Sequence, residues 1–560
     1  MASEPNYAQL LNYIYSHQCL PYDTVPSSSK NVSDALTPEI SKWKIHPVLI
    51  NAPTGSGKST FVFHQLADFA AQAGRYVLVL SNRLALNLQQ KANLCDLYGL
   101  PYIGSKALAE IKLFRNIILL TYQSVLQELN SGRLASLPIK YIVLDEAHFF
   151  CSDSVFNPWT GFILSALQRT FPKAVRIYMS ATPENVKPML AALETYHLNT
   201  LPQRLPGPNY DITLDLLLKT NTPKILEYKF QPNFQNISLI FFYHWDSLLD
   251  TIQESFESPE KWLIFVSEKN TGKSLKQILG NNYADYIDAD SPPRQITMLS
   301  KRQRFTKKVL ISTSVIDNGL SIHDRDLTHV VVDTLDRISM IQMLGRKRLT
   351  SDEKICLYVK LPSEVEQISN YRQAMENLHA TIVSYEKNPS GFVTHNWGGL
   401  TAAQQKLFAP SIQNGRMFLH TNVFAKYQLE LKCSEFEQLE EQLEQDEFAF
   451  TKQVCSWFHK DFSKNMILDN SPISDAVEKM TAILNTKLDF PITAEHDIIK
   501  VADELKACLS TSELKKLKFK NDTANRAASE IRKLLTVYHL PFELSKKRNG
   551  VYYIYPIPSE

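Results

Sequence analysis

The stretch NAPTGSGKST, residues 51–60, follows the short apolar run PVLI at 47–50. Its two glycines carry no Cβ, so a row of backbone N–H groups can approach a ligand closely. Lys58 adds a positive charge, and Ser59 adds a hydroxyl that can ligate a cation. The order matches the phosphate-binding pattern G-x-x-x-x-G-K-[ST], with Ala52 in the place of the first glycine. The loop therefore predicts nucleotide binding directly after a buried strand.

Short apolar strands alternate with helical patterns on the C-terminal side of this loop. Continuous apolar strands separated by helices favour parallel sheets that are covered on both faces. The pattern predicts two tandem α/β domains of similar size. The strands of the first domain lie at 76–81, 116–121, 141–146 and 175–180, and those of the second lie at 262–267, 308–313, 329–334 and 356–361.

The size and composition of the chain limit the classes of protein to consider. A chain of 560 residues is too long for one hydrophobic core, so three or four domains are expected. A hydrophobic content of 44% and a charged content of 21% are those of an ordinary globular protein. Because the net charge is only +2, any nucleic-acid contact is expected to come from local patches and not from a globally basic body.

The cysteines and the apolar runs bear on the compartment. The seven cysteines include no C-x-x-C pair, which is typical of reduced thiols in an intracellular protein. No apolar run reaches the roughly 18 residues of a membrane span. The start MASEPNYAQLL lacks the basic and apolar regions of a secretion signal. We therefore expect a cytoplasmic protein without a membrane partner.

Changes in the pattern divide the chain into five parts. The proline-bearing segment LPQRLPGPNY at 201–210 interrupts the first run of strands, and the strand signal fades after about Pro362. In the part that follows, Phe436, Leu439 and Leu443 have the spacing of an amphipathic helix with a solvated acidic face. The predicted parts are an N-terminal extension at 1–44 with a short helix and a loose connection, α/β domains at 45–215 and 216–365, a mostly helical region at 366–495, and a small module at 496–560.

The run VLDEAH places two adjacent carboxylates, Asp145 and Glu146, at the end of a predicted strand. Hydrolysis of a phosphoanhydride needs a metal ion between the β- and γ-phosphate oxygens and a group that orients and deprotonates water. Asp145 suits the metal, with Ser59 of the phosphate-binding loop as a second ligand, and Glu146 suits the general base. A solvated Asp-Glu pair at a strand end is the alternative, but the preceding loop and the following His148 favour the catalytic interpretation.

From about residue 48 to 350 the chain resembles the superfamily 2 helicases and translocases, with a DEAH-type motif II at Asp145–His148. LSNRLAL, LTYQSV and SATP resemble motifs Ia to III, and WLIFVSEKNTGKSL, VLISTSVIDNGLSI and QMLGRKRL resemble motifs IV to VI. The resemblance implies two tandem RecA-like P-loop NTPase domains with ATP and Mg²⁺ as cofactors. It implies ATP contacts from Pro53, Thr54, Gly55, Ser56, Gly57, Lys58, Ser59 and Thr60, strand contacts from Arg83, Thr121 and Thr313, and coupling through His148, Ser180 and Thr182.

Motif VI departs from the family pattern. Gln342 and Gly345 stand where the family places them, and Arg346 is the safer choice for the arginine that neutralises charge on the γ-phosphoryl group. The family motif usually ends G-R-x-G-R or G-R-x-x-R, whereas here Arg348 places the second arginine one position early. Arg348 either substitutes for that second arginine or is a surface charge. The preference for ATP over other nucleotides comes from the resemblance alone.

The last part of the chain is locally basic. Residues 511–550 hold ten basic and four acidic side chains, a local charge of +6 in a nearly neutral chain. A helical pattern at 523–540 precedes two short strand-like pieces joined around KKRNG, where Asn549-Gly550 predicts a hairpin turn. Helices followed by such a hairpin resemble a winged-helix module, which would contact phosphates. A small packing domain with charged edges is the alternative.

The sequence predicts nucleic-acid-stimulated ATP hydrolysis coupled to unwinding. The TYQS form and the winged-helix-like tail favour DNA slightly over RNA as the partner. A translocase that moves along duplex without separating it would use the same motifs. A scaffold that binds nucleic acid under the control of ATP is a third alternative, which the intact Lys58, Asp145, Glu146 and Arg346 argue against. The sequence indicates no particular protein partner.

Overall fold

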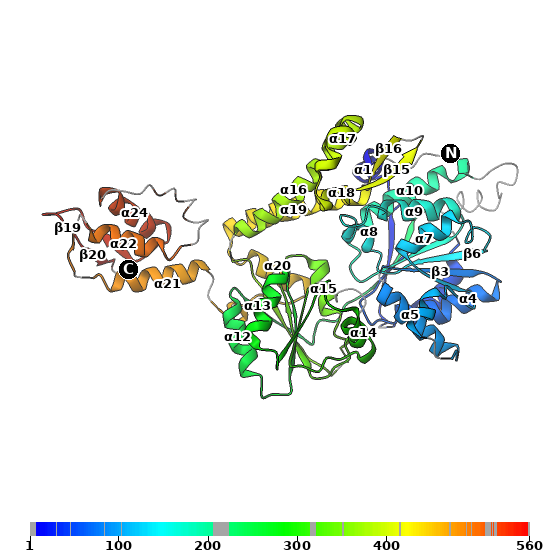
Figure 1. Cartoon of the computed structure of the whole chain (residues 1–560), viewed down its shortest axis with the longest axis horizontal. Helices are drawn as coiled ribbons and strands as arrows, with labels where there is room; N and C mark the ends of the chain where they lie inside the picture. The colour runs from blue at the N-terminus through cyan, green and yellow to red at the C-terminus, as the bar shows by residue number, and fades with distance from the viewer. Residues whose placement is uncertain are drawn as a thin grey trace.

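The structure of the chain is a computed structural model, and Figure 1 shows it whole. It describes residues 7–29, 31–44, 46–82, 84–101, 104–204, 223–313, 321–349, 352–363, 365–413, 416–469, 472–488, 490–493, 496–509, 514, 517, 519 and 524–557.

The first domain is built on an eight-stranded sheet with the strand order β1-β8-β2-β7-β6-β3-β5-β4. Its strands pair in parallel, except for the short edge pair β4 and β5. Two apolar cores lie on its two faces, which is why the central strands are apolar throughout. The strands are β1 (Tyr22–Ser27), β2 (Val48–Asn51), β3 (Tyr76–Ser81), β4 (Leu113–Phe114), β5 (Ile117–Thr121), β6 (Ile139–Leu144), β7 (Val175–Ser180) and β8 (Ile225–Phe230).

Helices cover both faces of this sheet (Figure 1). The chain from Lys58 to Gln72 is helical without interruption and includes a wider π-type turn, η2 (Phe61–Leu66). The helices are α1 (Tyr7–Tyr15), α2 (Val32–Leu36), η1 (Thr37–Lys42), α3 (Lys58–Thr60), α4 (Ala67–Gln72), α5 (Leu84–Leu97), α6 (Ser105–Glu110), α7 (Tyr122–Asn130), α8 (Phe149–Ser152), α9 (Thr160–Thr170) and α10 (Lys187–Arg204).

The loose connection expected before residue 44 is wrong for part of that segment. Tyr22–Ser27 forms β1, which pairs in parallel with β8 at the edge of the first sheet. The sequence YDTVPS is polar and contains Pro26, and an edge strand tolerates both because one side of it faces solvent. The first sheet therefore includes one strand from before residue 45 and one from after residue 215.

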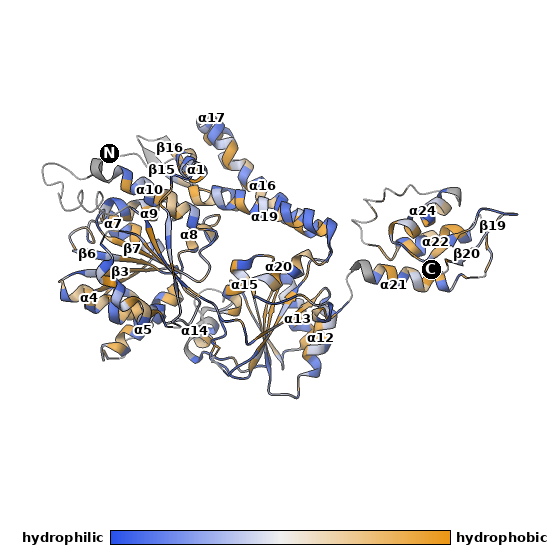
Figure 2. Cartoon of the chain, turned by 180° about the vertical axis from the view of Figure 1, so that it is seen from behind, coloured by the Kyte–Doolittle hydropathy of each residue, from blue (hydrophilic) through white to orange (hydrophobic). Residues whose placement is uncertain are grey.

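The second domain is a six-stranded parallel sheet with the order β11-β12-β10-β13-β14-β9. Apolar cores again lie on both faces, and Figure 2 shows the apolar strands of both domains. The two sheets confirm the predicted pair of tandem RecA-like domains. The elements are β9 (Ile237–Phe242), α12 (Trp245–Glu254), β10 (Lys261–Phe265), α13 (Lys269–Leu279), β11 (Ala284–Ile287), α14 (Pro293–Arg302), β12 (Val309–Ser312), β13 (Leu327–Val332), α15 (Arg337–Leu344) and β14 (Ile355–Lys360).

The helical region contains two long helices that pack side by side across both domains (Figures 1 and 2). It also contains an antiparallel hairpin of β15 and β16, which the prediction of a mostly helical region did not include. Asn414-Gly415, which lies outside the described residues, was a sequence signal for a hairpin between these strands. The elements are α16 (Val365–Lys387), α17 (Pro389–His395), η4 (Trp397–Gly399), α18 (Ala402–Gln405), β15 (Phe408–Gln413), β16 (Arg416–Thr421), α19 (Val423–Gln445), α20 (Ala449–Trp457) and η5 (Lys464–Met466).

The C-terminal module has its own apolar core and the element order of a winged helix. Strand β17 pairs with β19, and β18 pairs with β20, in both cases antiparallel. Asn549 (φ 49°) and Gly550 (φ 79°) make the predicted two-residue turn. The elements are α21 (Pro472–Asn485), β17 (Ile492–Thr493), α22 (Asp497–Lys506), α24 (Ala524–Val537), β18 (Phe542–Leu544), β19 (Val551–Tyr552) and β20 (Ile554–Pro556).

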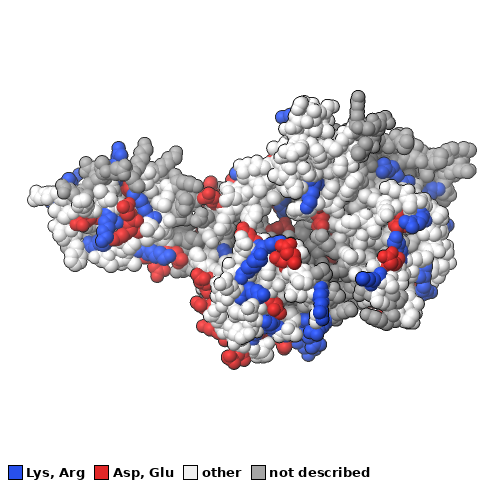
Figure 3. Space-filling view, viewed as in Figure 1, with Lys and Arg blue, Asp and Glu red and all other residues white. Residues whose placement is uncertain are grey.

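Basic and acidic side chains are interspersed on the face of the molecule shown in Figure 3. Such a surface is consistent with the nearly neutral net charge of the chain. Within the described part of the chain, every helix is too short or too polar to cross a bilayer.

Candidate nucleotide site between the two α/β domains

The phosphate-binding loop connects the buried strand β2 to the helix that begins at Lys58. Gly55 (φ 82°) and Gly57 (φ 85°) both hold left-handed backbone, which glycine adopts without a steric penalty. Because Gly57 is the residue directly before the helix, the loop aims the free N–H groups of the first helical turn outward from the strand end. Such a helix start attracts phosphate.

Lys58 is buried, with 8% of its surface exposed. Its Nζ donates to the backbone carbonyls of Ala52 (2.7 Å) and Pro53 (3.0 Å), so the loop itself holds the ammonium group. Burial lowers the pKa of Lys58, while the carboxylates of Glu146 and Asp145 oppose that lowering. A buried ammonium group that is held by neutral carbonyls fits an anionic phosphate as a further partner.

Asp145 follows strand β6, and its carboxylate is held by two donors. Its Oδ2 accepts from Gln90 Nε2 (3.0 Å), and its Oδ1 accepts from the backbone N–H of Glu146 (3.1 Å). Burial and the adjacent Glu146 carboxylate raise the pKa of Asp145. A divalent cation would relieve both effects, so Asp145 and Ser59, a carboxylate and a hydroxyl oxygen, suit Mg²⁺ chemically.

Glu146 has a left-handed backbone (φ 52°), which is uncommon for a residue with a Cβ. The sheet holds this conformation, because Asp145 N–H donates to Leu80 O (3.0 Å) and Ala147 N–H donates to Met179 O (2.8 Å) on the two neighbouring strands. Burial alone would raise the pKa of Glu146, but the positive groups around it, among them Lys58 and the arginines of motif VI, lower it overall. These positive groups therefore favour the carboxylate form of Glu146.

His148 links the end of strand β7 to the second domain. Its Nδ1 lies 3.1 Å from Ser180 Oγ and 3.5 Å from Glu146 Oε2. Its Nε2 accepts from Gln342 Nε2 of α15, which leaves the ring proton on Nδ1 when the imidazole is neutral. Burial lowers the pKa of His148, so the neutral form is favoured. Ser180 Oγ in turn accepts from Thr182 N–H (3.0 Å).

The second domain approaches the phosphate-binding loop through α15 and the residues after it. A Cβ on Gly345 would lie 2.7 Å from Thr54 Oγ1 and 3.2 Å from Ile341 O, so a larger residue here would push the loop and the helix apart. Arg346 is buried and its Nε donates to Gln342 O (3.0 Å). Arg348 Nε donates to Ser321 Oγ (3.0 Å), and its buried Nη1 has no hydrogen-bond partner among the described residues.

The charges at this interface are unbalanced in a way that fits an anion. Lys58, Arg346 and Arg348 all act electrostatically on Glu146 and each is buried or nearly so. Burial and the neighbouring Arg346 lower the pKa of Arg348, and Glu146 opposes that lowering. A polyphosphate between the two domains would place negative charge beside these three cations.

Most of the predicted nucleotide residues come from strand ends that meet at one edge of the first sheet, facing α15. Two of the three predicted nucleic-acid contacts, Thr121 and Thr313, lie at the ends of other strands, β5 and β12. Thr121 is the N-cap of α7, where its hydroxyl accepts from Ser124 N–H (3.1 Å). Arg83 lies outside the described residues, as does most of motif V after Thr313.

Two buried residues that support Asp145 were missed by sequence reasoning. Gln90, on α5, holds the Asp145 carboxylate as described above. Tyr122 OH donates to Asp145 O (2.8 Å), and its ring stacks on Phe149 with the ring centroids 4.5 Å apart. Tyr122 directly follows Thr121 in the TYQS stretch, so its place in that motif could have identified it as a residue of the site. No sequence signal distinguished Gln90 from other helix residues.

Comparison with known proteins gives a partial match. Residues 26–185 match the family described as "Type III restriction enzyme, res subunit". The replication restart protein PriA of Rickettsia conorii is 29% identical over 202 residues, which are 34% of this chain and 30% of PriA. PriA of Rickettsia felis is 27% identical over 228 residues, 38% of this chain and 34% of PriA. The match thus spans about a third of the length of these relatives.

A solved structure also resembles the chain. Mycobacterium smegmatis helicase Lhr, bound to single-stranded DNA and AMP-PNP, superposes with a TM-score of 0.41 and 16% identity, covering 64% of this chain and 48% of Lhr. The family match and the PriA relatives agree with the resemblance to superfamily 2 helicases that the ordered motifs give.

Proposed function

We propose that this chain is an ATP-dependent nucleic-acid helicase, in which ATP hydrolysis between the two α/β domains drives strand translocation and unwinding. The observation that carries the proposal is the composite site. The phosphate-binding loop and the paired carboxylates of the first domain face Gln342, Arg346 and Arg348 of the second domain. A direct hydrogen bond from Gln342 to His148 joins the two domains at this interface.

Each residue of the site has a proposed role. The loop residues 53–60 bind the phosphates, with Lys58 next to the β- and γ-phosphates. Ser59 and Asp145 would hold Mg²⁺, which supplies charge neutralisation on the phosphate oxygens when it is bound. Glu146, an anion in a fixed backbone conformation, accepts a proton from the attacking water. In this proposal Asp145–His148 is a DEAH-type motif II.

The arginines stabilise charge that develops on the γ-phosphoryl group, an effect worth roughly 10³–10⁵ in rate in related chemistry. Arg348 has the stronger claim on this role in the described geometry, because its Nη1 is buried and has no described partner while Arg346 is bonded to its own helix. Both arginines lie on the second domain. Their engagement therefore requires the domains to be closed on the nucleotide.

The hydrogen bonds through His148 supply the coupling. Gln342 of the second domain donates a hydrogen bond to His148 of the first domain. His148 lies next to Glu146, and also next to Ser180 and Thr182 at the end of β7. Separation of the domains breaks the Gln342–His148 bond and changes the surroundings of Glu146. Movement of the domains and the chemistry at Glu146 are then linked in both directions.

We propose Arg83, Thr121 and Thr313 as nucleic-acid backbone contacts. DNA is favoured over RNA because the sequence relatives are named replication restart proteins and because the C-terminal module has the element order of a winged helix. A translocase that moves along duplex would use the same two-domain site.

ATP turnover and strand displacement, measured on one preparation, test the proposal. A helicase hydrolyses ATP faster when a strand is added and displaces a labelled strand from a partial duplex. Stimulated turnover without displacement would replace the helicase with the duplex translocase. An absence of turnover with every nucleic acid would replace it with the ATP-gated scaffold.

A further inference from the structure

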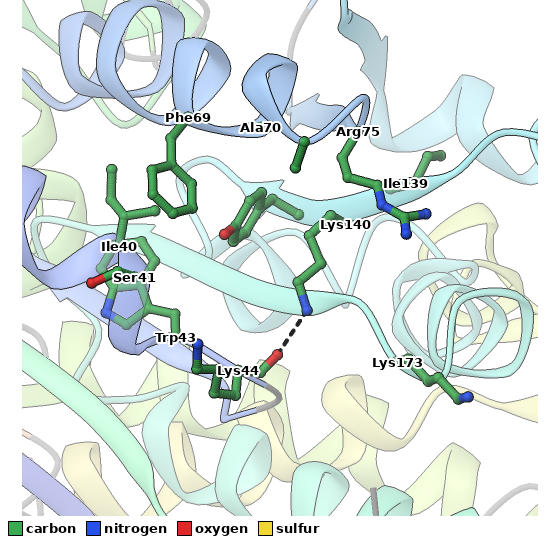
Figure 4. Close-up of a pocket in the computed structure, with 12 residues that line it drawn as sticks. Ile40, Ser41, Trp43, Lys44, Phe69, Ala70, Arg75, Ile139, Lys140 and Lys173 are labelled. Atoms are coloured by element: carbon green, nitrogen blue, oxygen red, sulfur yellow. Dashed lines mark hydrogen bonds between the residues drawn. The ribbon is translucent and has the colours of Figure 1, made fainter. Parts of the chain in front are cut away.

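A cationic pocket of about 490 Å³ lies on the first domain (Figure 4). It lies at the amino ends of the strands, whereas the nucleotide site lies at their carboxyl ends. Lys44, Arg75, Lys140 and Lys173 line it, and each lies near the start of a strand: β2, β3, β6 and β7 in turn. These are four adjacent strands of the sheet. The nucleotide site lies at the other ends of the same strands, roughly 20 Å away for a six-residue strand.

The pocket has an apolar side and a cationic side. Figure 4 shows Ile40 and Phe69 on one side, and Arg75, Lys140 and Lys173 on the other. Phe69, on α4, is 37% exposed, so part of its ring is open to a ligand. The pocket is therefore amphipathic.

The lining of the pocket carries a net positive charge. The described residues that line it include four basic side chains and no aspartate or glutamate. The Arg75 side chain has no hydrogen-bond partner among the described residues. Lys140 Nζ donates to Lys44 O (3.0 Å), which holds the ammonium group at the pocket. Burial, together with Lys44 and Arg75, lowers the pKa of Lys140, as expected where cations are brought together.

We propose that this pocket binds a small organic phosphate of about nucleotide size, with its phosphates on Arg75 and Lys140 and its apolar or aromatic body against Ile40 and Phe69. Arginine recognises phosphate by paired hydrogen bonds, and lysine adds charge. The volume falls within the range of small-molecule pockets, whereas a nucleic-acid polymer would need a continuous basic track. The site is distinct from the phosphate-binding loop and does not depend on the proposed helicase function.

The test uses full-length protein saturated with Mg²⁺ and a non-hydrolysable ATP analogue, to which the fluorescent organic phosphate mant-GDP is added. We expect one further equivalent to bind. The double variant Arg75→Ala/Lys140→Ala should weaken that binding by about tenfold or more, since each position loses a charge-assisted contact. Lys106→Ala removes one charge from the same domain outside the pocket and should leave binding unchanged.

Two further variants distinguish this pocket from the nucleotide site and from a general anion surface. Lys58→Ala should not change the additional binding, and a loss in that variant would show that mant-GDP reports on the nucleotide site. Phe69→Ser should weaken the binding of mant-GDP but not competition by pyrophosphate, and equal effects on both would reduce the pocket to a general anion surface.

The proposal is overturned if no additional equivalent binds, if the double variant binds as the parent does, or if only a single-stranded oligonucleotide displaces the probe. Thermal melting checks the folding of each variant, and ATP turnover adds a second check for the variants that retain Lys58. If the double variant melts early, Arg75→Gln is used in its place, because Arg75 makes no described side-chain bond that folding would lose.

Discussion

Glu146 combines an unusual backbone with a chemical role. Left-handed backbone costs a residue with a Cβ about 1–2 kcal/mol, and here hydrogen bonds from the two neighbouring strands hold it. The backbone hydrogen bonds at the strand end hold this conformation, and the carboxylate of Glu146 takes no part in them. An exchange of the side chain for one of equal shape should therefore remove the base without moving the site.

The substitution Glu146→Gln is predicted to retain ATP binding and to lower ATP turnover by about 10²-fold or more, because the amide cannot accept a proton from water. Equilibrium binding of a fluorescent ATP analogue and steady-state phosphate release measure the two effects. Lys58→Ala is the matched control and should abolish turnover through loss of phosphate binding. Near-parental turnover by Glu146→Gln would remove Glu146 from the role of base.

Separate substitution of the motif VI arginines is predicted to give unequal losses of turnover. Arg348→Ala should lower the rate of hydrolysis more than Arg346→Ala, because the Nη1 of Arg348 is available to meet the γ-phosphoryl group whereas Arg346 is bonded to Gln342 O. Single-turnover ATP hydrolysis with enzyme in excess over nucleotide measures the chemical step. A larger loss for Arg346→Ala would reverse this assignment.

At the scale of elements, α19 connects the two domains outside the motifs. Phe424 at its start lies in the core of the first domain, and Leu439 near its end lies in the core of the second. Asn422, the N-cap, donates to Ser154 O (3.1 Å), Asn157 O (3.0 Å) and Thr160 Oγ1 (2.7 Å) of the first domain. The helix therefore packs against both domains and connects them.

Lys432 of α19 also reaches the helix that carries motif VI. Its Nζ donates to Asp336 Oδ1 at 2.6 Å, and Asp336 Oδ2 caps α15 by accepting from Ser339 N–H (2.8 Å). Because α15 carries Gln342, we predict that Lys432→Met lowers nucleic-acid-stimulated kcat by roughly 5- to 30-fold, from the loss of a charged hydrogen bond, with a smaller change in KM for ATP. Lys432→Arg should restore most of the rate, and Lys426→Met, on the same helix, is the control.

The pH dependence of this pair follows from its pKa shifts. Burial acts against both charges, but the partners outweigh it: the pKa of Asp336 is lowered and that of Lys432 is raised to about 12. The stability from Asp336 is thus lost only as the pH falls below about 4, and that from Lys432 only as the pH rises towards about 12. Between about pH 5 and pH 9 the effect of Lys432→Met on kcat should stay constant. A strong variation in that window would contradict the assignment.

The turn between β18 and β19 is the basic wing, residues 545–550. We predict that Lys546→Ala/Lys547→Ala/Arg548→Ala weakens binding to duplex DNA and lowers the slope of log K against log salt by up to about 0.9 for each phosphate that is no longer neutralised. Lys479→Ala, on α21 of the same module, is the control. An unchanged slope would favour the packing domain over a nucleic-acid-binding module.

At the scale of the whole molecule, the strand ends and the glycine loop were predictable because local patterns encode them. The phosphate-binding loop, the Asp145-Glu146 pair and the two parallel sheets follow from runs of a few residues. Contacts between distant segments had no such pattern. The pairing of β1 with β8, the support of Asp145 by Gln90, and the Lys432–Asp336 bond each join residues far apart in sequence.

Other features that the sequence did not predict have a different physical cause. The left-handed backbone of Glu146 is imposed by the sheet, against the local preference of the residue. The β15–β16 hairpin lies among strong helical patterns, which outweighed its single Asn-Gly signal. The basic pocket arises only when the starts of four strands, separated by long stretches of chain, meet at one edge.

The most direct test of the proposed motor is ATP hydrolysis, measured with the full chain in the presence of single-stranded DNA, duplex DNA or RNA, each alongside displacement of a labelled strand. If ATP hydrolysis between the two domains drives unwinding, basal turnover should be slow, and a DNA strand should stimulate it strongly. The complement of that strand should be displaced. Lys58→Ala should lose turnover, its stimulation and strand displacement. Turnover that no polymer alters, or that persists in Lys58→Ala, would contradict it.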